Sequence, residues 1–412
     1  MGAATTPVAI TGLGMVTPAG DDADTTWDGV CSGRSAAARD PLLAGLPVDF
    51  SCRIRLSDEE LDHRVGRKSW RMGRAEKFAV LAAREAVADA GLDPKAWDAS
   101  RVATVIGCGM GGVQKWEEQQ ARLHERGPDM VSPLAIPMII PNQVAGGVSI
   151  DLNARGASLA PATACASGAT AIAVARDLLA SGLCDIVVAG GAEAAIGRLC
   201  TTGFWRMGAL SERVDDVSGA SRPFAADRDG FVMAEGAGIL VMERADDALA
   251  RGARPRALLA GCGSTSDAYH PTSPPEGAWG AEAALRAALT EAGVSPHDVE
   301  HVNAHGTSTP LNDATEAALI ARVLPHRPSV TSAKGALGHT LGAAGAVEAV
   351  LTVLTMQHRV VPPVANLQAP APEFDIDLVV KEPRQQHVRT AVSHSFGFGG
   401  HNVVLALRTW QS

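Results

Sequence analysis

The chain has 412 residues, of which 46% are hydrophobic and 20% are charged, and its formal net charge is −9. This length allows one large core in two parts, and the acidic balance argues against a nucleic-acid binder, which would lean basic. Seven cysteines lie at scattered spacings without a CxxC pair, and no apolar stretch reaches the roughly 18 residues of a membrane helix. We therefore expect a cytoplasmic protein with no disulfide framework, no metal site and no membrane partner.

Strands and helices alternate along the chain. Strands are predicted at 8–11, 102–106, 184–189, 235–243, 302–304, 330–332 and 403–407, and helices at 75–90 and 283–292. Residues 12–14 are predicted to form a turn, and 107–112 are a second Gly-rich segment. Neither has the spacing of a dinucleotide-binding loop. The alternation predicts an α/β fold with largely parallel strand pairing.

Two segments share one order of features. Residues 159–190 and 329–357 each contain a short apolar segment, a polar turn, a reactive side chain and a helix of small residues. The two helices are predicted at 166–181 and 341–356. A helix without a polar face is buried, so we predict a duplicated unit whose halves, 1–252 and 253–412, face each other.

Cys165 lies in the sequence TACASG, at a predicted turn between a strand and a helix. The start of a helix favours a thiolate, so the pKa of this thiol is expected to be lowered. A thiolate is the nucleophile that thioester exchange needs. The alternative is a buried structural cysteine, the usual environment of a free cysteine.

Two histidines lie in similar turns after predicted strands. His305 lies in NAHGTSTP, where Thr307 and Thr309 add hydroxyls that can bind an amide-rich ligand, and His339 lies in KGALGHT. Near a helix start an imidazole tends to stay neutral and can donate from Nε2 to a developing oxyanion. Two such groups could hold an enolate formed when a malonyl group loses carbon dioxide. The alternative is a pair of hydrogen-bonded structural histidines.

Two further features adjoin these turns. Lys334 and Glu348 flank His339, and their Gly- and Ala-rich surroundings favour a buried ion pair over a surface pair. The run FGFGGHN at 396–402, which contains Phe398, can point backbone N–H groups at a ligand as an oxyanion hole. A plain Gly-rich loop is the alternative for this run.

These motifs occur in the order found in β-ketoacyl-acyl carrier protein synthases of the I/II type, which the chain resembles from about residue 8 to 407. DRDGFVMAEGAG at 227–238 and TSDAYH at 265–270 are also similar to that family. The resemblance implies a thiolase fold, a five-layered αβαβα sandwich of two duplicated halves. It also implies a dimer, either of identical chains or with a subunit like a chain-length factor.

The resemblance also implies the roles of single residues. Cys165, His305 and His339 would be catalytic, with Lys334 and Glu348 as a supporting pair. The amides of Cys165 and Phe398 would form the oxyanion hole, Phe398 would gate the site, and Thr307 and Thr309 would bind the phosphopantetheine arm. The substrates would arrive on an acyl carrier protein, and the reaction would need no cofactor and no metal.

Details of the sequence suggest a deep acyl pocket that reaches the dimer interface. Residues 131–138 resemble actinobacterial long-chain synthases, and Ala135 stands where many homologues place a bulky Phe. Met110 and Phe204 are expected along the pocket wall. CASG at 165–168 departs from the CTSG turn that is usual in aromatic polyketide synthases, which leaves the pathway, fatty acid or polyketide, open.

A run of basic side chains is the expected docking site for an acidic carrier protein. The spacing i, i+3, i+4 places most of them on one face of a helix. The run comprises Arg64, Arg67, Lys68, Arg71, Arg74 and Lys77. A solvated basic helix is the alternative.

The expected reaction is a decarboxylative Claisen condensation of an acyl chain on Cys165 with malonyl carrier protein. A thiolase would use a second cysteine near the C-terminus as base, and 392–407 contains none. A non-catalytic scaffolding subunit would not need the Cys and both His. A Cys–His hydrolase would lack its acidic third member.

Overall fold

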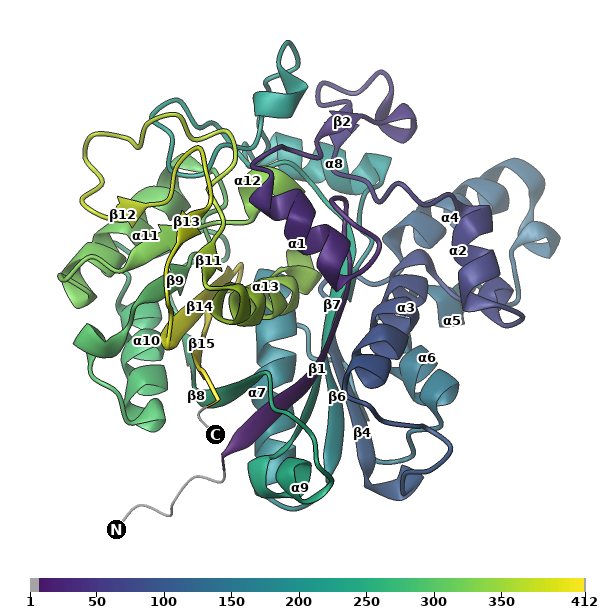
Figure 1. The fold of residues 1–412 in the computed structure, drawn as a ribbon. Helices are drawn as coiled ribbons and strands as arrows, with labels where there is room; N and C mark the ends of the chain where they lie inside the picture. The colour runs from purple at the N-terminus through teal and green to yellow at the C-terminus, as the bar shows by residue number, and fades with distance from the viewer. Residues whose placement is uncertain (1–6, 411–412) are drawn as a thin grey trace.

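The computed structural model describes residues 7–410, and its centre is one large mixed sheet (Figure 1). The strands, in spatial order, are β12 (Asp377–Leu378), β10 (Ser329–Thr331), β9 (His301–Asn303), β14 (Thr390–Gly397), β15 (His401–Arg408), β8 (Ala257–Ser266), β1 (Val8–Val16), β7 (Gly236–Arg244), β6 (Ile186–Glu193), β4 (Val102–Gly107) and β5 (Ser158–Leu159). Only three residues of β1, from Val8 to Ile10, pair with β8. Because β1 and β8 pair over so few residues, the sheet is divided into two halves at this point.

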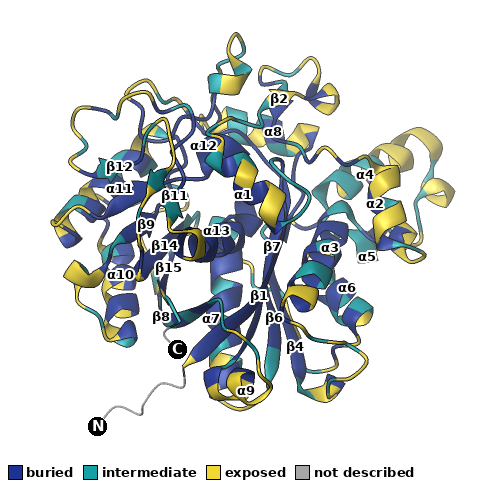
Figure 2. Ribbon diagram, in the orientation of Figure 1, coloured by how far each residue is buried: buried dark blue, intermediate teal, exposed yellow. Residues whose placement is uncertain are grey.

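Helices form the remaining three layers. α7 (Ser167–Ala180) and α13 (Ala344–His358) lie between the two sheet halves, and α13 is buried from Ala344 to Met356 (Figure 2). The outer faces are covered by α3 (Arg74–Asp89) and α6 (Gln143–Leu152) on one side, and by α10 (Trp279–Ala292) and α11 (Pro310–Val323) on the other. The five-layered α/β sandwich expected from the resemblance is confirmed.

The remaining elements are short or peripheral. They are α1 (Ala23–Cys31), α2 (Asp58–Val65), α4 (Val113–Arg126), α5 (Ala135–Ile139), α8 (Arg198–Arg206), α9 (Ala245–Ala250) and α12 (Lys334–Leu337), with the two-stranded sheets β2 (Ala38–Arg39) with β3 (Phe50–Ser51) and β11 (Val360–Val361) with β13 (Arg384–Gln385). Among residues 7–410, no helix combines the length and the apolar character that crossing a bilayer requires.

The expectation of largely parallel pairing is wrong. Strands at both ends of the sheet pair in parallel, but every neighbouring pair from β14 through β15, β8, β1 and β7 to β6 is antiparallel. β14 and β15 form a hairpin, and β7 enters the sheet after the long segment 207–235 instead of a crossover helix. An antiparallel neighbour needs no crossover helix, so the alternation of elements did not reveal this pairing.

The predicted turn at 12–14 is also wrong, because β1 continues through it to Val16. A Cβ atom at Gly12 would lie 2.0 Å from the carbonyl oxygen of Ala86, and one at Gly14 would lie 2.0 Å from that of Ala82. These glycines therefore let α3 pack directly onto the strand. Their role is close packing and not a change of chain direction.

Candidate active site

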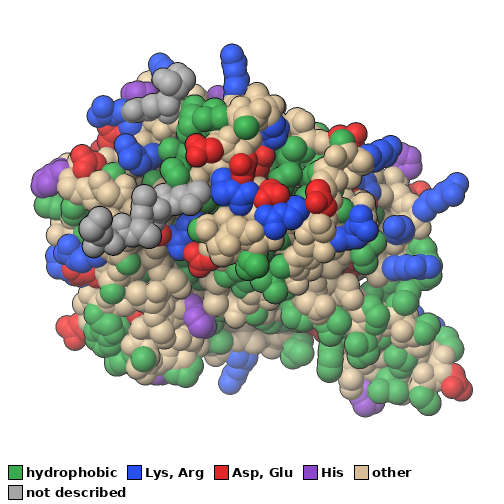
Figure 3. Space-filling model, turned by 90° about the horizontal axis from the view of Figure 1, so that it is seen from below, with side chains coloured by type: hydrophobic (Ala, Val, Ile, Leu, Met, Phe, Trp, Pro, Cys, Tyr) green, Lys and Arg blue, Asp and Glu red, His purple; other side chains and the backbone are tan. Residues whose placement is uncertain are grey.

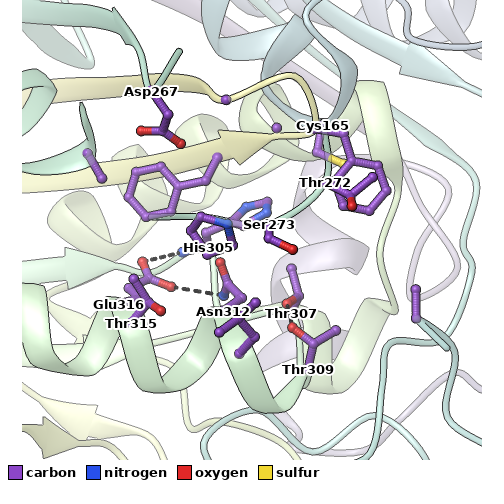
Figure 4. Close-up of a pocket in the computed structure, with 18 of the residues that line it drawn as sticks. Cys165, Asp267, Thr272, Ser273, His305, Thr307, Thr309, Asn312, Thr315 and Glu316 are labelled. Atoms are coloured by element: carbon purple, nitrogen blue, oxygen red, sulfur yellow. Dashed lines mark hydrogen bonds between the residues drawn. The ribbon is translucent and has the colours of Figure 1, made fainter. Parts of the chain in front are cut away.

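A cavity of about 320 Å³ brings together the reactive side chains that the sequence singled out. Cys165 precedes α7, His305 follows β9, His339 follows α12, and Phe398 follows β14; all four line this cavity (Figure 4). The rings of His305 and His339 are 5.4 Å apart between centroids and nearly perpendicular. Segments that are far apart in the chain therefore form one site.

The backbone around Cys165 presents two free donors. Ala164 has a positive φ of 49°, a strained conformation that turns the chain into α7. A Cβ atom at Gly397 would lie 3.3 Å from the amide nitrogen of Cys165, so the end of β14 lies against this turn. Within residues 7–410, the amides of Cys165 and Phe398 donate no hydrogen bond. Such neighbouring free N–H groups can stabilise an oxyanion.

The pKa of Cys165 differs from the expectation. Burial raises the pKa of this thiol to about 12, against the opposing effect of the Lys334 ammonium. The expectation of a lowered pKa is therefore wrong. Burial removes the sulfur from water, which disfavours the thiolate. This effect is larger than the stabilisation that the helix start and the nearby cation give to the thiolate.

The hydrogen bonds of His305 define its tautomer. Lys334 Nζ donates to the backbone carbonyl of His305 at 2.5 Å and to its Nδ1 at 3.3 Å. Burial, followed by the charge of Lys334, holds the pKa of His305 well below its usual value, so the ring is neutral near pH 7. A neutral ring whose Nδ1 accepts carries its hydrogen on Nε2.

His339 has the same tautomer for a different reason. The backbone N–H of Leu341 donates to Nδ1 of His339 at 3.3 Å, which leaves the hydrogen on Nε2. Burial, with a contribution from Lys334, holds the pKa of His339 well below its usual value. Two neutral imidazoles therefore offer Nε2–H groups, as expected, although burial and Lys334 account for their neutrality better than a helix start does.

Lys334 and Glu348 form the buried ion pair that their surroundings predicted. Their side chains are 2% and 3% exposed, and Lys334 Nζ donates to Glu348 Oε1. Burial raises the pKa of the Glu348 carboxyl to about 7, although Lys334 opposes this shift. The pair holds the ammonium group against His305, so it acts on the site through that ring.

The threonines of the HGTSTP motif also line the cavity. Thr307 and Thr309 share a hydrogen bond of 2.9 Å between their Oγ1 atoms, at the start of α11. Figure 4 shows both threonines among the residues that line the cavity, together with His305 and Asn312. They are placed to contact an elongated ligand that enters the cavity.

Two buried carboxylates were not predicted from the sequence. Glu316 on α11 accepts from the amides of His305 and Gly306 at 2.8 and 2.7 Å. Glu193, the last residue of β6, accepts from the amides of Gly109 at 2.7 Å and Gly342 at 3.3 Å, and burial raises its pKa to about 7. Glu193 could have been noticed as a lone acid in a strand of small and apolar residues, whereas Glu316 shares α11 with Asp313 and gave no such signal.

The expected wall of the acyl pocket is only partly present in this cavity. Phe204 lines the cavity and packs 6.5 Å from Phe398 between ring centroids. Met110 and Ala135 are not among the residues that line it. Met110 is exposed after β4, and Ala135 is buried at the start of α5. A deep acyl pocket past these two residues stays a prediction.

The basic run does not form one helical face, so that expectation is wrong. α2 ends before Gly66, whose φ is 92°, and α3 begins only after Gly73, so the run is divided between two helices and a turn. Arg74 is buried against Glu235, and Lys77 pairs with Asp62. The members that stay exposed, without an ion pair among residues 7–410, are Arg67, Lys68 and Arg71.

Comparisons with known proteins agree over nearly the whole chain. The family model for the N-terminal domain of beta-ketoacyl synthases matches residues 5–248, and that for the C-terminal domain matches 256–368. The 3-oxoacyl-[acyl-carrier-protein] synthase 2 of Synechocystis sp. is 42% identical over 410 residues, 98% of each chain. The Staphylococcus aureus protein of that name is 40% identical over 98% of this chain and 99% of its own.

Solved structures are also similar to this chain over nearly its whole length. The ishigamide ketosynthase/chain length factor matches with a TM-score of 0.91 and 33% identity, over 99% of this chain and 100% of its own. A type II PKS acyl-carrier protein in complex with its ketosynthase has a TM-score of 0.91 and 30% identity, over the same shares. A beta-ketoacyl synthase from Burkholderia phymatum has a TM-score of 0.91 and 33% identity, over 98% and 100%.

Proposed function

The chain belongs to the β-ketoacyl synthase family, and from that premise we propose that Cys165, His305 and His339 catalyse a decarboxylative condensation. The protein is a β-ketoacyl-acyl carrier protein synthase, an acyltransferase of fatty acid or polyketide biosynthesis. One observation carries the residue assignment. A thiol, two Nε2–H imidazoles and two free amides surround a single cavity.

The first half-reaction loads the nucleophile. The sulfur of Cys165 attacks the thioester of an acyl carrier protein, its proton is transferred to the departing sulfur, and the carrier leaves as its free thiol. The tetrahedral oxyanion accepts hydrogen bonds from the amides of Cys165 and Phe398. The phosphopantetheine arm contacts Thr307 and Thr309, and Phe398 gates its entry.

The second half-reaction extends the chain. A malonyl carrier enters and loses carbon dioxide, and the Nε2–H groups of His305 and His339 stabilise the enolate oxygen. The enolate carbon attacks the acyl carbonyl on Cys165, and the sulfur leaves and regains a proton. The product is a β-ketoacyl carrier protein two carbons longer. Each step uses side chains and amides of this chain, so the scheme assigns no role to a metal or a cofactor.

Product analysis tests this function directly. The protein, an acyl carrier protein loaded with a medium-length acyl chain, and malonyl carrier protein are expected to yield a β-ketoacyl carrier protein that mass spectrometry detects. A hydrolysed acyl chain without a condensed product would instead favour the hydrolase alternative. Absence of both products would contradict an active condensing enzyme.

We also propose that the protein acts as a dimer, with a second copy or with a subunit like a chain-length factor. β5 is an edge strand whose two residues are both exposed, so a partner sheet can extend it. The lobe on the right of Figure 3, where Figure 1 places α4 and α5, presents many hydrophobic side chains. Exposed apolar side chains in and beside these helices are Met110, Trp116, Leu123, Met130, Ile136 and Ile140.

We retain the division into halves at 1–252 and 253–412, because each half supplies one central helix and one outer helical layer.

Cytoplasmic location also stays a proposal. All seven cysteines, which lie within residues 7–410, are free thiols, as a reducing compartment would leave them.

Docking of an acidic carrier protein is proposed at Arg67, Lys68 and Arg71. The double change Arg67→Glu and Lys68→Glu is expected to raise the KM for carrier protein several-fold at low salt, because like charges slow encounter. The effect should shrink when salt shortens the Debye length to about 8 Å or less. Steady-state kinetics at several ionic strengths measure this change.

A matched control reverses the same amount of charge elsewhere. Arg34 and Arg254 are exposed and form no ion pair within the described chain, so Arg34→Glu with Arg254→Glu should leave KM nearly unchanged. Equal effects in the two double variants would show that net charge, and not this docking site, controls the KM.

A further inference from the structure

A second buried pair lies on the other side of His305 from Lys334. His394 on β14 and Glu316 on α11 are 0% and 1% exposed, and Nδ1 of His394 lies 3.0 Å from Oε1 of Glu316. Because a carboxylate oxygen accepts, Nδ1 of His394 is the donor in this contact. His394 is not part of the cavity lining, so it does not contact the reacting groups directly.

Glu316 transmits this contact to His305. Its Oε1 accepts from the amide of His305 at 2.8 Å, and its Oε2 accepts from the amide of Gly306 at 2.7 Å. Figure 4 shows the Glu316 carboxylate near His305, with one dashed bond to His305 and one to Asn312. The carboxylate therefore holds two consecutive N–H groups of the turn that carries the histidine.

The two buried pairs bind different polar groups of His305. Lys334, held by Glu348, binds the carbonyl oxygen and Nδ1 of His305. Glu316, held by His394, binds the N–H of His305. With both ends held, the direction of the Nε2–H bond is determined by the two pairs together. A change at either pair should tilt the ring.

Packing adds a second connection along β14. The ring of His394 lies 5.5 Å from the ring of Phe396, which lies 5.8 Å from the ring of His305. No described atom is a hydrogen-bond partner of His394 Nε2. Among residues 7–410, the one polar contact of this imidazole is therefore the bond to Glu316. Loss of that bond would remove a donor from the buried carboxylate.

We propose that His394 is a positioning residue, which acts through Glu316 to orient the His305 ring toward the enolate oxygen. This inference rests on the proposed role of His305 in decarboxylation. It assigns His394 to the second half-reaction alone. Loading of Cys165 uses the amides of Cys165 and Phe398 and not the Nε2–H group of His305, so it should not depend on His394.

Two variants of His394 distinguish the effect of losing the Nδ1–H donor from the effect of changing the volume of the side chain. His394→Asn keeps an N–H near the position of Nδ1, and His394→Leu removes it. We expect His394→Leu to lower kcat for malonyl decarboxylation and condensation together by about ten-fold or more, because small misplacements of a catalytic group can cost about 10²-fold. His394→Asn should restore most of this loss. The KM for malonyl carrier and the single-turnover rate of Cys165 acylation should stay near wild type.

His301 supplies a matched control. It is also fully buried on a neighbouring strand, binds one side chain, Ser329, and has an unpartnered Nε2. His301→Leu should lower Tm without a selective loss of kcat. The proposal is overturned if His394→Asn loses as much kcat as His394→Leu, if acylation falls in parallel, or if His301→Leu shows the same selective loss. A wild-type protein that neither decarboxylates nor condenses would instead contradict the proposed function itself.

Discussion

Replacement of Cys165 by alanine should abolish condensation, with product formation reduced by about 10³-fold or more, because no other described group can hold the acyl chain as a thioester in the cavity. The variant should still fold, since the change removes one half-buried sulfur. Mass spectrometry after incubation with acyl carrier protein should show no acyl adduct on the variant and one adduct on the wild type.

Companion variants make this result specific. Cys200 is also half-buried but does not line the cavity, so Cys200→Ala should keep the adduct and the activity. Cys165→Gln should still release carbon dioxide from malonyl carrier, because His305 and His339 are intact. If Cys165→Ala elongated an acyl chain at the wild-type rate, the covalent scheme would be wrong.

The second large effect is expected at Lys334. Lys334→Met leaves the buried Glu348 carboxylate without its cation, and removal of one partner from a buried pair costs about 3–5 kcal/mol. It also removes the donor to Nδ1 of His305, so the tautomer with Nε2–H loses its support. Urea unfolding should show a lower midpoint, and decarboxylation should fall even where the variant is folded.

A surface pair offers the comparison for Lys334. Lys115 pairs with Glu118 on α4 while about a third of each side chain is exposed, so Lys115→Met should cost about 0–1 kcal/mol. The double change Lys334→Met and Glu348→Leu should recover much of the stability and little of the activity, because the buried charge is gone but His305 stays without its donor. Equal midpoints for Lys334→Met and the wild type would contradict a buried ion pair.

The candidate side chains could be predicted from the sequence because each occupies a recognisable local position. Cys165 precedes a helix of small residues, His305 follows the short strand β9, and His339 follows Gly338 at the end of the short helix α12. Such positions depend on residues adjacent in the chain. The central helix α13 was also predictable, since a helix without a polar face has to be buried.

Other features depended on neighbours that are distant in the chain. The sequence suggests a turn at Gly12 and Gly14 because their contact with α3, about 70 residues later, leaves no local signal. It suggests one helix for the basic run, although Arg74 binds Glu235, 161 residues away. The sequence predicts a lowered pKa for Cys165 from the helix start alone. It does not reveal the burial of the thiol, which raises this pKa.

The sequence identified Cys165, His305 and His339 as candidate residues and predicted the alternation of strands and helices and the duplicated halves, because motif spacing and periodicity are properties of consecutive residues. Packing of distant segments established the antiparallel middle of the sheet, the tautomers of His305 and His339, and the two buried pairs around His305. These depend on distances between segments and on exclusion of water, and both arise only when the halves pack together.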